Sequence, residues 1–492
     1  MATTTPKPTL YNAIWRWHFY AGLFCIPLVI WLALTGSIYL WRPQVEAWLD
    51  KPYDHLATSG PVATPEAQVA AALRAVPGAT LHKYVLPQAP DSAIRVLVTS
   101  HGVDKRVYVD PRSLEVLKVA TEEKRPFRMI FHLHGELLAG AVGSYIVEIA
   151  ACWAVVMLLS GLYLWWPRGG AGVAGVLYPR LRRGSRIFWR DLHATTGIWV
   201  SVFALALILT GLPWAKGWGT YLGEVRALTG TARGPVDWTI GGKAPAPDPA
   251  NSMADMPGME GMGEAAAGQG MAGMRGKAAG AGMHDVPNAA ASATTGDDPH
   301  EEHRDMTMPH VTLRPGDLSR VITTARTLNL APPVLVMVPG AVGAPWSVSS
   351  DAADRPLRAD AKIDGATGRI LSRTDFAERH WIDRAVGYGV AGHEGALFGI
   401  ANQLLGTVTA IFLIMLAVSG AVMWWRRRPI GLLGAPVRLS RPAIGAGLIA
   451  IIVALGLYMP VFGATLILVL LTEKLILRHL PKTRRWLGLA PT

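Results

Sequence analysis

Cysteine is nearly absent from this chain, and charged side chains are scarce for its length. Cys25 and Cys152 are the only two cysteines among 492 residues, and both lie in apolar runs. Two isolated thiols of this kind exclude a disulfide framework and a cysteine-based metal site. Charged residues make up 17% of the sequence against 51% hydrophobic residues, and several apolar runs reach the roughly 20 residues of a bilayer-spanning helix. The composition therefore predicts an integral membrane protein.

The sequence also lacks the common signatures of soluble cofactor enzymes and hydrolases. It contains no Cys-x-x-Cys-His for covalent haem, no Gly-x-Gly-x-x-Gly between a strand and a helix, and no P-loop. It has neither a Ser-His-Asp nor a His-Glu-x-x-His pattern. Nicotinamide, flavin and hydrolase chemistry within the chain are therefore unsupported. Electrons for any redox reaction would have to come from a quinol or from a separate partner.

The formal net charge of +12 is concentrated in short basic segments. These segments are residues 168–190, 426–441 and 478–485. Short basic loops face the cytoplasm in membrane proteins, so this charge indicates topology rather than nucleic-acid binding. Both termini are then predicted to be cytoplasmic, and the long segments between the spans lie on the opposite side.

Apolar periodicity and turn residues divide the chain into spans and soluble segments. We expect an α-helical integral membrane protein with about six spans, built as a tandem repeat of span, soluble α+β domain and span. A C-terminal helical hairpin follows, although a re-entrant hairpin is the alternative, because Met459-Pro460 breaks the last apolar run. A low-complexity insert occupies about 244–310. The predicted boundaries are 1–42, 131–167, 194–215 and 393–426 for four spans, 43–130 and 216–392 for the soluble segments, 168–193 and 427–442 for the basic loops, 443–478 for the hairpin and 479–492 for the tail.

Four histidines occupy matching places in the two halves of the chain. His18 and His193 each lie 18 residues before the glycine of a Thr-Gly pair, and His134 and His393 each lie 27 residues before the glycine of a Ser-Gly pair. The predicted topology puts His18 and His193 at the cytoplasmic face and the other two at the far face. Because two facing imidazoles can hold one haem iron, each face is predicted to carry one bis-histidine haem b.

His132 competes with His134 as a cofactor ligand. The repeat favours His134, because Ala391 occupies the place that matches His132. Two residues apart on a helix, the two imidazoles point in different directions, so only one of them would face the iron.

Three charged residues in or beside the spans have open roles. Arg16 and Arg190 shortly precede two of the histidines, and they would either pair with haem propionates or anchor the cytoplasmic face. Glu148 lies inside the second span, where it would either relay protons or bond to a neighbouring helix.

The insert is rich in methionine and histidine. Thioethers spaced by three residues outside a membrane suit Cu(I), which predicts copper capture. The alternative is a flexible linker of biased composition. The candidate copper ligands are Met253, Met256, Met259, Met262, Met271, Met274, Met283, His284, His300, His303, Met306, Met308 and His310.

Taken together, these motifs resemble the PepSY-associated transmembrane family. The resemblance lies in the two histidine-containing span starts with their Thr-Gly pairs, and in residues 109–111, 131–135 and 161–166. It implies a bacterial inner-membrane protein with PepSY-like periplasmic domains. Some members are similar to ferric-siderophore reductases that hold two b-type haems through span histidines, which implies ligand roles for the four matched histidines. The insert departs from the family pattern and raises copper as the metal.

The sequence thus predicts an inner-membrane dihaem protein surrounded by lipid. It would pass electrons from a quinol or a cytoplasmic donor to a periplasmic metal complex, either a ferric siderophore or copper. One alternative is a PepSY module with a binding or regulatory role and structural histidines. Another is a haem-free membrane protein that handles copper through the insert.

Overall fold

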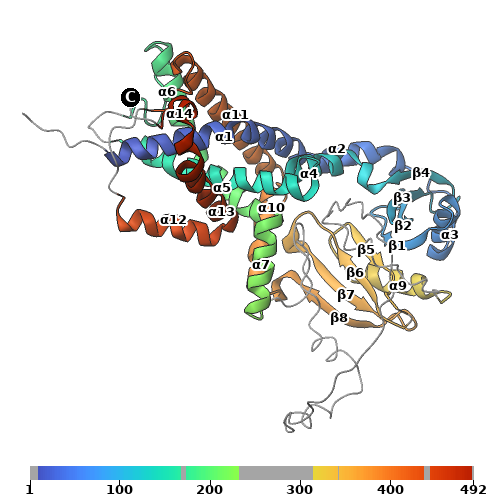
Figure 1. Ribbon diagram of the computed structural model, residues 1–492. Coiled ribbons are helices and arrows are strands. Elements are labelled where there is room, and N and C mark those ends of the chain that lie inside the picture. The colour runs from blue at the N-terminus through green and yellow to red at the C-terminus, as the bar shows by residue number, and fades with distance from the viewer. Residues whose placement is uncertain (1–8, 168–172, 232–313, 342, 437–443, 490–492) are drawn as a thin grey trace, which may run out of the picture.

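The computed structural model describes residues 9–167, 173–231, 314–341, 343–436 and 444–489. Figure 1 shows long helices gathered in a bundle at one end of the molecule and a β-sheet with two short helices at the other. Five helices in the described part are long and apolar enough to cross a membrane, so the chain is a multi-pass membrane protein. They are α1 (Thr9–Leu40), α5 (Gly140–Trp165), α6 (Ser185–Gly211), α11 (Ile400–Arg427) and α13 (Pro460–Leu471) with the turns that continue it to His479.

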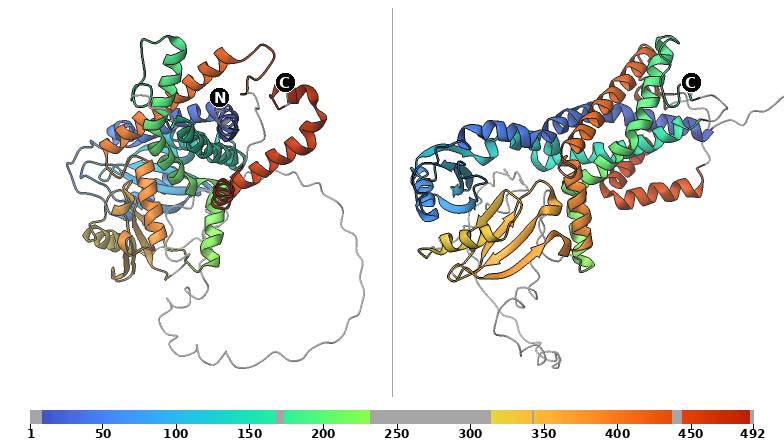
Figure 2. Two further views of the ribbon diagram at one scale, coloured as in Figure 1. Left: turned by 90° about the vertical axis from the view of Figure 1, so that its left-hand side faces the viewer. Right: turned by 180° about the vertical axis from the view of Figure 1, so that it is seen from behind.

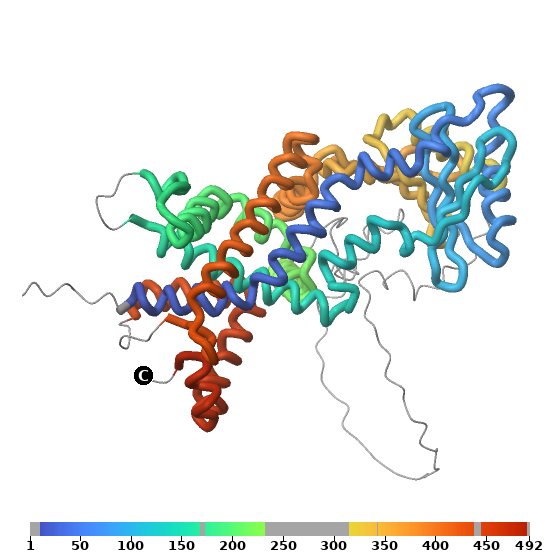
Figure 3. Tube along the Cα trace, turned by 90° about the horizontal axis from the view of Figure 1, so that it is seen from above, coloured from blue at the N-terminus to red at the C-terminus, as the bar shows by residue number. Residues whose placement is uncertain are grey.

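The bundle is built from helices that are far apart in the sequence. Helix α1 packs against both α5 and α11, and α6 packs against both α11 and α5. Figure 3 shows α11 crossing α1 when the molecule is seen from above. Cys25 and Cys152 are both free and buried among these helices, as expected for small apolar side chains.

The last apolar region has one span fewer than predicted. Helix α12 (Ala446–Tyr458) has 13 residues and ends at Met459, where Pro460 begins α13. Proline cannot continue the hydrogen-bond ladder of the preceding helix, which explains the break. A helix of 13 residues extends about 20 Å, well short of the roughly 30 Å hydrocarbon core. The two helices meet at an angle, as Figure 2 shows, with Gly456 against Gly463.

The two soluble segments form one continuous antiparallel sheet of eight strands, ordered β4-β3-β2-β1-β5-β6-β7-β8. Two separate domains were expected, but β1 pairs with β5, with Tyr84 opposite Val336. An unpaired edge strand exposes a row of backbone donors and acceptors, so this seam satisfies an edge of each half. The strands are β1 (Thr80–Val85), β2 (Ile94–Ser100), β3 (Val103–Val109), β4 (Val116–Thr121), β5 (Val334–Met337), β6 (Trp346–Ser350), β7 (Ala359–Ile363) and β8 (Ile370–Asp375).

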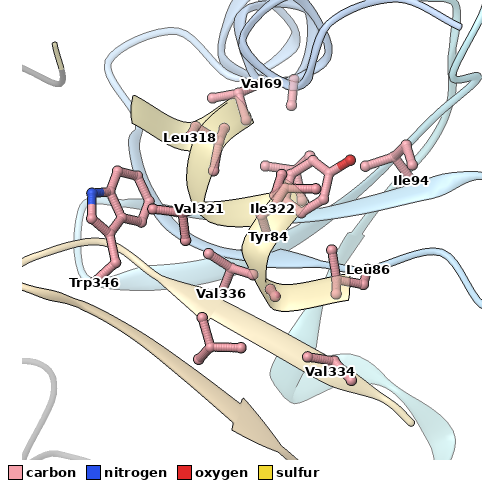
Figure 4. Packing of buried hydrophobic residues seen from close by; sticks show 14 of the residues in the cluster. Val69, Tyr84, Leu86, Ile94, Leu318, Val321, Ile322, Val334, Val336 and Trp346 are labelled. Atoms are coloured by element: carbon pink, nitrogen blue, oxygen red, sulfur yellow. The ribbon is translucent and has the colours of Figure 1, made fainter. Parts of the chain in front are cut away.

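One core lies between the sheet and the helices α3 (Pro65–Ala75) and α9 (Asp317–Thr327), which both cover the same face. Figure 4 shows side chains from both helices and from the central strands interleaved, including Tyr84 and Trp346. Strand residues at alternate positions point into this core, as the period of two requires. The core therefore spans the β1–β5 seam and unites both soluble segments.

Three shorter helices connect the bundle to the sheet: α2 (Arg42–Asp50), α4 (Pro126–Glu136) and α10 (Trp381–His393). A fourth, α7 (Lys216–Leu228), follows α6 and contacts α5. Helix α4 follows β4 and α10 follows β8, and these two strands are the outermost of the sheet. A buried bidentate ion pair joins α7 to α10, with Arg226 Nη1 and Nη2 at 2.6 and 2.8 Å from the two oxygens of Asp383.

The second and fourth spans begin later than the boundaries predicted at 131 and 393. Leu137 and Leu138 have φ angles of 52° and 57°, and this left-handed conformation ends α4 before α5 begins at Gly140. Likewise α10 ends at His393, and α11 begins at Ile400. His134 and His393 therefore lie on short helices that precede the spans.

Candidate cofactor-binding site

The structure brings the four histidines together in two facing pairs. His18 on α1 faces His193 on α6, with ring centroids 6.3 Å apart and an interplanar angle of 81°. His134 on α4 faces His393 on α10, with ring centroids also 6.3 Å apart and an angle of 65°. These are the two pairs that the predicted topology assigns to opposite faces. We call His18 and His193 the basic-side pair, and His134 and His393 the sheet-side pair.

The separation within each pair suits a metal ion between two imidazoles. A bond of about 2 Å from metal to nitrogen, plus about 1 Å from nitrogen to ring centre on each side, places two ring centroids about 6 Å apart. The observed 6.3 Å in both pairs meets this requirement. Direct stacking of the rings does not occur, because both pairs are steeply inclined. The donor set of two imidazoles is one that haem iron accepts.

In the basic-side pair, backbone carbonyls fix the orientation of both rings. The Nδ1 of His18 lies 3.0 Å from the carbonyl oxygen of Met157, and the Nδ1 of His193 lies 3.1 Å from that of Leu416. A carbonyl only accepts, so each Nδ1 carries the hydrogen and donates it. The Nε2 lone pair is then available to a metal, an arrangement typical of metal-binding histidines.

The sheet-side pair is oriented in a similar way, with threonine hydroxyls taking part. The Nδ1 of His393 lies 2.9 Å from the carbonyl oxygen of Leu207 and 3.2 Å from the hydroxyl of Thr210. The Nδ1 of His134 lies 3.0 Å from the hydroxyl of Thr35. Burial and the neighbouring His393 lower the pKa of His134 to about 4, so that its ring is neutral and keeps a free lone pair.

Each imidazole rests on a glycine of a neighbouring spanning helix. A Cβ added at any of these glycines would lie 3.0 to 3.3 Å from the Cε1 of the ring, closer than ordinary van der Waals contact. The absence of a side chain therefore makes room for each ligand. The four contacts are His134 on Gly36, His18 on Gly161, His393 on Gly211 and His193 on Gly420.

These contacts explain the motif spacing found in the sequence. The Thr-Gly and Ser-Gly pairs belong to the helices that receive the rings, and their hydroxyls approach Nδ1, as Ser160 and Ser419 do at 3.0 and 3.1 Å. Along α1, the 18 residues between His18 and the seat of His134 at Gly36 correspond to about 27 Å. The two pairs are therefore separated by nearly the thickness of a bilayer core.

A cavity of about 230 Å³ opens at the sheet-side pair, and His134 and His393 both line it. Its walls are mainly apolar residues of α1, α5, α6 and α11, together with Glu148 and Trp214. This volume is many times that of one water molecule, so the space is sized for a larger ligand.

His132 lies outside both pairs. Its Nε2 is 3.2 Å from Glu123 and its Nδ1 is 2.9 Å from Glu136. These hydrogen bonds raise the pKa of His132 to about 9, so the ring is charged at neutral pH and has no lone pair for a metal. The geometry favours His134 over His132, as the matched spacing in the sequence does.

The two arginines proposed as propionate partners are bound to other groups in the protein. Arg16 is buried and donates to the backbone carbonyls of Pro436 and Gly488 and to the hydroxyl of Tyr20. Arg190 donates to Asp191 at 2.6 and 3.1 Å. Their predicted contact with haem stays a prediction.

Sequence reasoning did not single out Trp214 and left Glu148 open. One oxygen of Glu148 accepts the backbone N–H of Gly217 at 2.8 Å, so this carboxyl caps the start of α7. The Trp214 ring lies 6.4 Å from that of His393 and 5.8 Å from that of Phe131. No motif or matched spacing in the sequence marks Trp214.

The predicted copper ligands between Met253 and His310 lie outside the described residues. Within the described ranges, no group of three or more His, Cys, Asp or Glu side chains is arranged to hold a metal ion. The paired imidazoles are therefore the candidate metal-binding groups of the described part, and each pair offers two ligands.

The fold and the site together define a helical, multi-pass membrane protein with two facing imidazole pairs and a separate sheet domain. The chain belongs to the PepSY-associated TM region family, whose sequence model matches residues 15–427. The match includes all four paired histidines and both soluble segments, and it ends before α12. No curated protein matches the sequence significantly.

Proposed function

We propose that this chain is a b-type dihaem electron-transfer protein of the bacterial inner membrane that reduces a periplasmic metal complex. The observation that carries the proposal is the presence of two pairs of facing imidazoles. In each pair the ring centroids are 6.3 Å apart, and each ring contacts a glycine of a neighbouring helix. Haem would supply one-electron chemistry at both places. The four paired histidines would hold the two haems, and the chain would fix the orientation of the imidazoles and provide apolar surroundings.

The arrangement of the pairs supports a direction across the membrane. The basic-side pair lies at the end of the bundle where Arg16 and Arg427 are found, the end that the positive-inside rule assigns to the cytoplasm. The sheet-side pair lies on helices that directly follow β4 and β8. A metal complex bound by the sheet domain would therefore meet the sheet-side pair, and the PepSY-like segments would be periplasmic.

We further propose that the chain is a tandem repeat. Each half places a helix before a four-stranded antiparallel meander, and each half seats two histidines on two glycines. The turns between the last two strands also correspond. Asp110 Oδ1 accepts the N–H of Ser113, three residues on, at 3.1 Å, and Asp364 Oδ1 accepts that of Thr367, also three residues on, at 2.7 Å.

Absorption spectroscopy of the purified protein tests the dihaem proposal. We expect a reduced b-type spectrum and two haems per chain. His18→Ala and His134→Ala should each remove one haem, because they belong to different pairs, whereas His132→Ala should keep both. A colourless preparation from haem-replete cells would contradict the proposal and favour a non-redox membrane module. Retention of two haems in both ligand variants would refute the pairing.

Copper is favoured as a second metal by the composition of residues 253–310, which supply soft thioether ligands. Deleting this segment should abolish Cu(I) binding without removing haem. Copper stoichiometry measured on both proteins tests this, and an unchanged stoichiometry would leave ferric siderophore as the proposed acceptor.

A further inference from the structure

One face of α7 changes its surroundings along the length of the helix. At the start of α7, Trp218 is buried against the junction of α12 and α13, and its Nε1 donates to the carbonyl oxygen of Tyr458 at 2.9 Å. Farther along, Tyr221, Val225 and Leu228 are exposed. Spacings of three or four residues put these three side chains on the same face as Trp218. An apolar face that begins against the helix bundle therefore continues past its edge.

Helix α7 also runs across the spanning helices rather than along them. Figure 1 shows it beside the sheet domain, across the direction of α1 and α5, and Figure 2 shows the same arrangement from behind. It follows the candidate span Ser185–Trp214 almost at once. The ten residues from Trp218 to Leu228 correspond to about 15 Å of helix. The second half of α7 thus lies at the boundary of the membrane and beyond the edge of the bundle.

The other sides of α7 face protein and water. Arg226 is buried and is bound to Asp383 of α10. Thr220 and Ala227 are exposed, and a helix of 3.6 residues per turn places them about 100° and 120° around the axis from Tyr221. The helix therefore presents one side to protein, one apolar side to its surroundings and one side to water.

We infer that α7 is an interfacial helix, with the side chains of Tyr221, Val225 and Leu228 buried in the lipid surface on the sheet side of the membrane. Lipid is the partner because these side chains continue the face that packs against the bundle, and the bundle there has a lipid-facing surface. Helix α12, whose end contacts Trp218, has no buried residue in the described structure. Apolar side chains together with a tyrosine at the water boundary suit such a position.

The anchored helix also braces α10. Arg226 donates to both carboxylate oxygens of Asp383, and α10 ends at His393. A displacement of α7 from the lipid surface is passed through this ion pair to the helix that carries one histidine of the sheet-side pair. Lipid contact at α7 thereby has a positioning effect on His393, although the two are not in direct contact through the side chains that face lipid.

Quenching by brominated lipid tests the lipid contact without relying on haem. Leu228→Cys is labelled with an NBD maleimide, and the full chain is placed in nanodiscs that contain brominated phosphatidylcholine. Both native cysteines are buried, so the introduced thiol is the reactive one. We expect quenching about twofold or more stronger than for Ala227→Cys, because the apolar face of an interfacial helix lies about 5–10 Å into the head-group boundary. Ala227 is the matched control, one residue away on the water-facing side.

Three results would overturn the lipid contact. Equal quenching at both positions would mean that α7 has no preferred face toward lipid, and no quenching at either would place the helix in water. Crosslinking of Leu228→Cys chains by a bismaleimide, without quenching, would assign the apolar face to a second copy of the chain. The haem spectrum is a separate readout: quenching at Leu228 in a protein without haem would sustain the interfacial helix and contradict the dihaem function.

Hydrogen exchange tests the brace. The double variant Val225→Glu, Leu228→Glu puts charge on the face that contacts lipid, which the membrane disfavours. In nanodiscs, peptides of residues 381–393 should exchange about tenfold faster than in the wild type, because α10 opens more readily. Peptides of residues 94–109 should not change, which shows that the sheet remains folded.

The double variant Thr220→Glu, Ala227→Glu is the matched control for the brace, since it adds the same charge on the water-facing side of α7. This variant should keep wild-type exchange in residues 381–393. Wild-type exchange in the lipid-face variant would overturn the brace, and equally fast exchange in the control would attribute the effect to charge rather than to lost lipid contact.

Discussion

The two imidazole pairs have the same separation but different surroundings. In the basic-side pair, both histidines lie on long spanning helices, and their Nδ1 atoms are held by carbonyls of α5 and α11. In the sheet-side pair, both histidines lie on short helices attached to the outermost strands, beside a cavity with unpaired polar atoms. Under the proposed function, electrons would be exchanged with ligands at the sheet-side pair, whereas the basic-side pair would be a relay fixed between the spanning helices.

Substituting the glycines that contact the histidine rings should have the largest effect, because each substitution should remove the haem of one pair and leave that of the other. Gly161→Val should remove the haem held by His18, and Gly36→Val the one held by His134, because the added Cβ lies 3.1 or 3.0 Å from the ring. Haem quantification should show about one haem per chain in each variant. Gly22→Val is the control, because Gly22 lies on α1 like Gly36 but its Cβ would lie 3.8 Å from Met157 Sδ, an ordinary contact. Loss of both haems in a single variant would mean that the pairs are not independent.

Breaking the ion pair between α7 and α10 should affect only the sheet-side pair. Arg226→Met leaves Asp383 buried without its bidentate partner, which costs about 3–5 kcal/mol of local stability. We expect a lower Tm and partial loss of the haem at His393, with the basic-side haem retained. The double variant Arg226→Met, Asp383→Leu should recover part of the stability. Equal losses of haem at both pairs would show that the two pairs are not independent.

Removing single hydroxyls should produce the smallest effects. Thr35→Val deletes a hydrogen bond to His134, and Ser160→Ala deletes one to His18, which keeps the Met157 carbonyl. A less basic imidazole stabilises ferric haem less, so the midpoint potential of that haem should rise by about 40 mV or less for about 1 kcal/mol. Redox titration measures both haems. A shift in the wrong haem would contradict the assignment of each hydroxyl.

The histidine pairs could be predicted because the matched spacings from histidine to glycine and the positions of the basic segments can both be read directly from the sequence. It also contained the Thr-Gly and Ser-Gly pairs, but their role depends on which helices pack together. Gly36 contacts His134, which lies 98 positions further along the chain, and no spacing rule within one helix predicts that contact. The matched glycines indicated where the site lies, but not that each of them makes room for a histidine ring of another helix.

Other features lay beyond sequence reasoning for physical reasons. Leucines rarely adopt positive φ, so the break between α4 and α5 at Leu137 and Leu138 had no sequence signal. The β1–β5 seam joins strands separated by roughly half the chain, and edge pairing depends on tertiary approach. The cap that Glu148 provides to α7 likewise needs the packing of two helices, and the sequence indicated a bond to a neighbouring helix only as one of two alternatives for this residue.

The seam between β1 and β5 has a consequence for how the protein can be assembled. The parts of the chain before and after residues 232–313 are held together by this pairing, by the shared core and by the contacts of α11 with α1 and α6. The peptide link through that stretch is then dispensable for association. We expect that two polypeptides, ending and starting within it, would find each other when co-expressed and would rebuild both imidazole pairs. In this respect the molecule behaves as a heterodimer whose two subunits happen to be translated as one.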